Sequence, residues 1–84
     1  MPLYKRALEI REKKLGNEHP DVAISLNDLA RLLQSQGDFV DAESFYERAL
    51  DIRKTNLGAE HPDVAKSLNN LANLLREMVM IEGY

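Results

Sequence analysis

Apolar residues recur along this chain every three or four positions, the periodicity of helices that bury one face. Four such segments are separated by short breaks. We expect helices at about residues 3–15, 21–36, 40–57 and 62–82. The pattern therefore predicts an all-α fold.

Glycine and proline mark the breaks between these segments. Gly16 and Gly58 each follow an apolar segment, and glycine readily adopts the left-handed conformation that closes a helix. Pro20 can open the next helix, because the amide proton it lacks would have no partner in the first turn. Gly37 interrupts the pattern between the second and third segments. The breaks predict four helices joined by short connectors.

The chain contains an internal repeat of 42 residues. The motif Leu-Gly-x-Glu-His-Pro-Asp-Val-Ala-x-Ser-Leu-Asn-x-Leu-Ala occurs at residues 15–30 and again at residues 57–72. When residues 4–35 are laid on residues 46–77, 21 of the 32 compared positions are identical. A helix-pair repeat of this length is typical of a solenoid, in which each unit covers the apolar face of its neighbour.

The spacing also predicts which side chains face the core. The expected core positions in the first and third helices are Tyr4, Ala7, Leu8, Arg11, Leu15, Ala42, Phe45, Tyr46, Ala49, Leu50, Ile52 and Arg53. Those in the second and fourth are Val22, Ala23, Leu26, Leu29, Ala30, Leu33, Val64, Leu68, Leu71, Ala72 and Leu75. We interpret Tyr4, Phe45 and Tyr46 as core aromatics, and Ser25 and Ser67 as small packing residues.

Composition and charge narrow the classes of function. A formal net charge of −3 and a pI near 5.3 argue against nucleic-acid binding, which normally needs a strongly basic face. The absence of cysteine rules out disulfides and thiolate metal sites. We find no apolar core of a signal peptide near Met1, and the longest apolar run is far too short to span a membrane. We expect a soluble, cytoplasmic protein.

Two histidines are candidate metal ligands. His19 and His61 each stand between glutamate and Pro-Asp, one whole repeat apart. They should be separated by roughly 10 Å or more, and no third ligand has the needed spacing. We therefore expect them to cap the following helices and predict no metal. We also find no acid–base pair and no histidine placed to activate a serine, so we expect neither an enzyme nor a cofactor.

The end of the chain departs from the repeat. Residues 78–81 read Met78, Val79, Met80 and Ile81, where the first copy has Gln-Gly-Asp-Phe. Without a glycine, the fourth helix should continue towards Glu82. Four consecutive apolar residues cannot all lie on one helix face, and exposed apolar surface often marks an interface. We expect self-association through these four residues, or alternatively a frayed chain end.

The pattern Leu29-Ala30, Gly37-Asp38-Phe39, Ala42, Tyr46 and Ala49 resembles the tetratricopeptide repeat. The 42-residue period and the Leu-Gly-x-Glu-His-Pro-Asp-Val-Ala connector are similar to the long repeats of kinesin light chains. The resemblance implies a right-handed α-solenoid fragment of four antiparallel helices. In it, residues 1–84 form a single domain of about two repeats. Its helices follow the order B-A-B-A, where A and B are the first and second helices of a repeat.

In that family the A helices line a concave groove that binds protein or peptide segments. Carried over by position, the groove residues are Ile24, Asn27, Arg31, Gln34, Ser35, Lys66, Asn69, Asn70, Asn73 and Glu77. Relatives that grip peptide carboxylates carry an asparagine at the positions of Asp28 and Asn70, of which only Asn70 matches.

The residue types indicate the same binding face, because these ten groove residues lie outside the leucine stripe and are mostly polar. Asparagine amides can donate and accept at once, which suits an extended peptide backbone. The alternative is that Asn27 and Asn69 bond to neighbouring helices. Arg31 and Lys66 favour an acidic or carboxylate-bearing ligand, with solvated cations as the alternative.

The sequence thus favours a non-enzymatic scaffold for protein–protein interaction, with a protein or peptide as partner and neither nucleic acid nor membrane. The competing hypothesis is a structural repeat unit that homo-oligomerises through its unpaired terminal helices.

Overall fold

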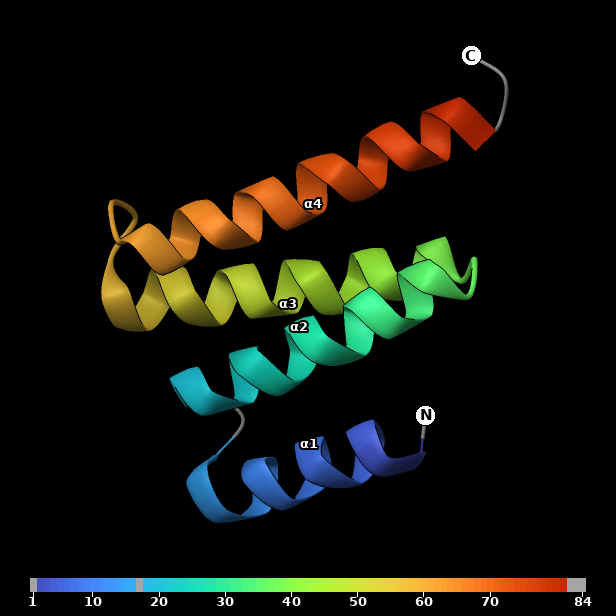
Figure 1. Ribbon diagram of the computed structural model, residues 1–84. Coiled ribbons are helices and arrows are strands. Elements are labelled where there is room, and N and C mark those ends of the chain that lie inside the picture. Colours follow the sequence, from blue (N-terminus) through green and yellow to red (C-terminus); the bar gives the residue numbers. More distant parts are fainter. Residues whose placement is uncertain (1, 17, 82–84) are drawn as a thin grey trace.

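The computed structural model describes residues 2–16 and 18–81, and the side chains of residues 3–16 and 18–80. Four helices account for most of this part of the chain: α1 (Pro2–Leu15), α2 (Pro20–Ser35), α3 (Phe39–Leu57) and α4 (Pro62–Ile81). They lie in one row in chain order, each antiparallel to the one before it (Figure 1). The prediction of a four-helix, all-α repeat fragment is confirmed.

The helix limits lie within one residue of those expected from the sequence. Glu82, where the fourth helix was expected to end, lies outside the described residues. Gly16 and Gly58 both have φ of 89°, as expected for residues that close helices. The Nδ1 atoms of His19 and His61 accept hydrogen bonds from the amides two residues later, each at 3.0 Å. The prediction that these histidines cap the following helices is confirmed.

The core lies between α2 and α3. Val22, Leu26 and Leu29 of α2 are fully buried, and Tyr46 and Ile52 of α3 are buried almost completely. These side chains belong to one apolar cluster, against which Phe45 and other half-buried residues pack. α2 is covered by α1 and α3, and α3 is covered by α2 and α4. The two central helices therefore bury two faces each.

Part of the predicted core was wrong, because several residues of the two outer helices, α1 and α4, are exposed. Tyr4 is 44% exposed, whereas Tyr46 at the same repeat position is 1% exposed. Leu68 is 51% exposed, whereas its counterpart Leu26 is fully buried. Leu15, Leu75, Ala7 and Ala72 are also exposed. The physical reason is that α1 packs chiefly on α2 and α4 packs chiefly on α3. The face that α2 and α3 bury against each other stays open on α1 and α4.

Candidate functional site

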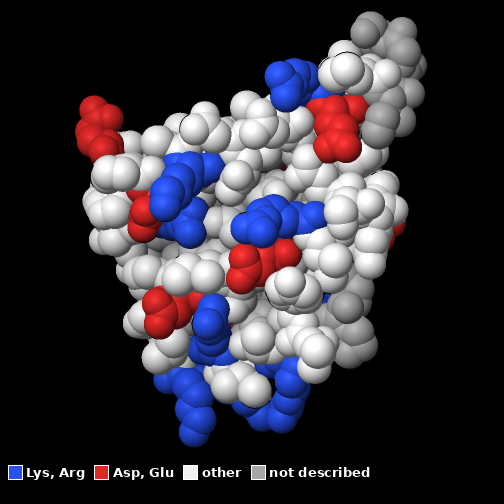
Figure 2. Space-filling view, in the orientation of Figure 1, with Lys and Arg blue, Asp and Glu red and all other residues white. Residues whose placement is uncertain are grey.

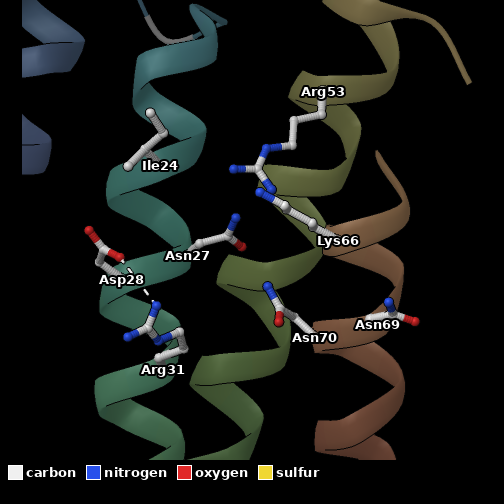
Figure 3. A pocket seen from close by; sticks show the side chains of 8 residues that line it. All are labelled: Ile24, Asn27, Asp28, Arg31, Arg53, Lys66, Asn69 and Asn70. Atoms are coloured by element: carbon white, nitrogen blue, oxygen red, sulfur yellow. Dashed lines mark ion pairs between the residues drawn. The ribbon is translucent and has the colours of Figure 1, made fainter. Parts of the chain in front are cut away.

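A pocket of about 370 Å³ lies between α2 and α4, with α3 at its back (Figure 3). It is lined by Ile24, Asn27, Asp28 and Arg31 of α2, Arg53 of α3, and Lys66, Asn69 and Asn70 of α4. The α2 residues recur at spacings of three and four, so they share one helix face. The repeat thus brings the same face of two A helices to one opening.

Arg53 is the buried cation of this pocket. Its side chain extends from α3, and the residue is only 9% exposed. Nη1 donates to the Ser67 Oγ at 2.9 Å and to the Asp63 carbonyl oxygen at 3.3 Å. With the Asn27 amide oxygen turned towards it, the guanidinium also donates from Nη1 at 2.7 Å and from Nη2 at 3.1 Å. All of these acceptors are neutral, so none of these contacts neutralises the charge of Arg53.

The charge of the pocket lining is positive. Arg31, Arg53 and Lys66 contribute three cations and Asp28 one carboxylate. The Asp28 carboxylate lies 3.8 Å from Arg31, an exposed pair one helical turn apart. In Figure 2, lysine and arginine side chains lie near the middle of the face, with acidic side chains beside them, and also along its lower edge. An anionic ligand group would therefore complement the pocket.

The pocket brings together six of the ten groove residues predicted from the sequence: Ile24, Asn27, Arg31, Lys66, Asn69 and Asn70. Asn73 is exposed on α4, outside this lining. Ser35 is exposed at the end of α2, and its hydroxyl donates to the Leu32 carbonyl oxygen at 2.7 Å.

Gln34 and Glu77 join helices to one another. The Gln34 Nε2 donates to the Glu77 Oε1 at 2.6 Å, and its Oε1 accepts from the Tyr46 hydroxyl at 3.0 Å. Burial raises the pKa of Tyr46, an effect that Arg31 opposes and Glu77 reinforces. The phenol therefore stays protonated and remains a donor to Gln34.

The two repeated asparagines have different surroundings. Asn27 is 7% exposed and bonds to Arg53 of the neighbouring helix. Asn69 is exposed and lies at the edge of the pocket away from α2 (Figure 3). The geometry of Asn27 matches the structural alternative, while a role of either residue in ligand binding stays a prediction.

Sequence reasoning missed Arg53 as a pocket residue, because the spacing placed it in the core stripe. Arg11 makes the same contacts one repeat earlier, donating to the Ser25 Oγ at 2.7 Å and to the Asp21 carbonyl oxygen at 3.3 Å. Ser25 and Ser67 are buried, as expected of small packing residues, and each also accepts an arginine hydrogen bond that the sequence did not predict. An arginine in an apolar stripe, followed 14 residues later by a serine in both copies, was the available signal.

The structure describes the side chains of three of the four residues that are predicted to self-associate. Met78 is half-buried against the core, while Val79 and Met80 are exposed. The side chain of Ile81 lies outside the described residues. Their role in self-association stays a prediction.

Within residues 2–16 and 18–81, no group of three or more histidine, aspartate or glutamate side chains is arranged to hold a metal ion. In the same part of the chain, no helix combines the length and the apolar character needed to cross a membrane.

Comparison with protein families gives two overlapping matches to one family model, described as tetratricopeptide repeat, at residues 2–55 and 33–78. Together they extend over residues 2–78, well over half of the chain. No curated protein matches the chain.

Proposed function

Because the chain belongs to the tetratricopeptide repeat family, whose repeats generally mediate protein–protein interactions, we propose that it is a scaffold that binds an acidic peptide segment between α2 and α4. The family is typically a non-enzymatic scaffold, which agrees with the class of function that the sequence favours. The cytoplasmic location and the likeness to kinesin light chain repeats belong to this proposal as well.

The charge of the pocket lining carries the proposal. Arg53 is held at the back of the pocket by neutral acceptors, and Lys66 reaches into the same space from α4 (Figure 3). A ligand carboxylate would supply charge-assisted hydrogen bonds, which are stronger than those of the neutral acceptors. The Asn70 amide can donate to a peptide carbonyl and accept from a peptide N–H at once. The lining thus suits a peptide with acidic side chains.

Peptide binding tests this function directly. Fluorescence anisotropy would compare labelled acidic peptides with the same peptides carrying glutamine for glutamate. We expect Lys66→Gln to weaken binding of the acidic peptides by up to about fivefold, the effect of one exposed ion pair. Lys54→Gln is the matched control, because Lys54 is an exposed lysine of α3 outside the pocket lining.

Added salt should weaken binding of the acidic peptides, since exposed charge pairs are screened. Equal affinity for the acidic and the neutral peptides would refute the proposed ligand class. If Lys54→Gln weakened binding as much as Lys66→Gln, the acidic peptides would not be bound specifically in this pocket.

A second function is favoured by a separate observation, the exposed apolar faces of the outer helices. Tyr4 and Ile10 of α1 and Leu68 and Leu75 of α4 are all more than two-fifths exposed. Such surface commonly marks an interaction site. We propose that the chain also self-associates through its terminal helices. Molar mass measured over a range of protein concentrations tests this function separately from peptide binding.

A further inference from the structure

We propose that two copies of this chain dock head to tail, with α1 of one copy packing on the open face of α4 of the other as α3 packs on α2. This inference rests on the self-association proposed above and names its partner surfaces. The α2–α3 interface within the chain is the template, because α4 repeats the sequence of α2 and α1 repeats that of α3.

The open face of α4 has the apolar residues of the face that α2 buries. In α2, Ala23, Leu26, Ala30 and Leu33 are buried. One repeat later the same residue types occur in α4, where all four are exposed: Ala65, Leu68, Ala72 and Leu75. α4 therefore presents the same apolar residues with which α2 packs on the B helix α3.

The open face of α1 completes the match. In α3, Tyr46, Ala49 and Ile52 are almost fully buried. Their counterparts in α1 are identical residues, and all three are exposed: Tyr4, Ala7 and Ile10. The seven buried residues named in this and the preceding paragraph thus recur, each as the identical residue, on exposed surfaces of the same chain. This identity selects a second copy as the occupant.

The polar contacts of the template recur too. Asn27 of α2 accepts hydrogen bonds from Arg53 of α3, and the corresponding residues are Asn69 of α4 and Arg11 of α1. Arg11 already bonds to Ser25 of α2 in the way that Arg53 bonds to α4. A docked copy would bring its Arg11 to the exposed amide of Asn69. The interface then gains a polar pair that fixes its register.

The symmetry of the contact distinguishes it from an ordinary dimer. The two surfaces are different, so each docked pair still presents one free α4 face and one free α1 face. Such heterologous contacts add further copies unless the rotation closes a ring. A symmetric contact between two α4 helices would instead stop at a dimer.

Sedimentation velocity on the full chain tests the proposal, at concentrations up to about 1 mM so that millimolar dissociation constants are detected. Leu68→Glu blocks the α4 face, and Ala7→Glu blocks the α1 face. Ser44→Glu adds the same charge at an exposed position of α3. Ile10→Glu is the second α1 variant, and circular dichroism verifies the helix content of each protein.

We expect the mass of the wild type and of Ser44→Glu to rise beyond a dimer with concentration. Leu68→Glu and Ala7→Glu should each be monomeric alone. Their equimolar mixture should form a 1:1 complex and nothing larger, because one intact face remains on each partner.

The contrary outcomes separate the two proposals. A wild type that stays monomeric at every concentration overturns both self-association and head-to-tail docking. Association that persists in Ala7→Glu and Ile10→Glu, or a mixture that forms no 1:1 complex, overturns head-to-tail docking alone.

Discussion

At the residue scale, Arg53 joins three helices, because its guanidinium bonds to Asn27 of α2 and to Ser67 and the Asp63 carbonyl of α4. Ser67 is fully buried, so loss of the arginine leaves buried polar atoms without a partner. We expect Arg53→Leu to lower the free energy of unfolding by roughly 1–3 kcal/mol.

The repeat supplies a matched comparison for this prediction. Arg11 makes the equivalent hydrogen bonds at the half-buried edge of α1. Arg11→Leu should therefore cost less than Arg53→Leu in urea unfolding measurements. Equal losses would show that burial of the arginine does not decide its contribution.

Tyr46 gives a prediction about alkaline pH. Burial raises its pKa above the ordinary 10.0 in the folded state, so the unfolded chain loses this proton first. The stability that this group contributes is therefore present below about pH 10 and is lost as the pH rises through the folded-state pKa. We expect Tyr46→Phe to remove part of this alkaline loss, measured as unfolding free energy at pH 8 and above 10. The same pH slope in both proteins would contradict the prediction.

The sequence could identify these two residues as repeated and inward-facing, but not their partners. The position of Arg53 in the apolar stripe correctly placed it inside. Its bonds to Ser67 and Asn27 depend on how three helices approach one another, which a periodicity cannot specify. For the same reason, the pocket lining that Arg53 contributes could be found only in three dimensions.

At the element scale, the connectors after α1 and α3 depend on glycine. Gly58 has φ of 89° and ψ of 151°, a backbone region that is almost restricted to glycine. Its surroundings leave space for a methyl group, since no atom lies within 4 Å of an added Cβ. Any cost of Gly58→Ala should therefore come from the backbone alone, at about 1–3 kcal/mol.

Chemical synthesis with D-alanine at position 58 is the control for this prediction. D-alanine favours positive φ, so it should largely restore the stability that L-alanine removes. Thermal unfolding of the three proteins measures the effect. Equal destabilisation by both alanines would point to a steric cause instead of backbone strain.

The elements themselves were largely predictable, whereas their burial was not. Helix limits follow from local signals such as Gly58 and Pro62, which act within a few residues of the chain. The exposure of Leu68 depends on whether another helix covers α4. Identical residues in α2 and α4 therefore have opposite burial, and no pattern within α4 distinguishes the two cases.

At the scale of the whole molecule, each helix contacts chiefly its neighbours in the row, so stability should decrease from the centre outward. α2 and α3 are covered on two sides, while α1 and α4 are covered on one. Local opening is easiest where few apolar contacts must break. We expect amide hydrogens to exchange with solvent slowest in α2 and α3 and fastest in α1. Hydrogen–deuterium exchange measured by mass spectrometry tests this order.

Head-to-tail docking would make the hydrogen-exchange rates of the outer helices depend on protein concentration. A docked copy covers the open faces of α1 and α4, so protection in these two helices should rise with protein concentration by mass action. Protection in α2 and α3 should change less, because both helices are already covered on two sides. Leu68→Glu should abolish the dependence, whereas Ser44→Glu should preserve it. Exchange in α1 and α4 that ignores concentration would mean that the open faces of these helices stay uncovered in solution.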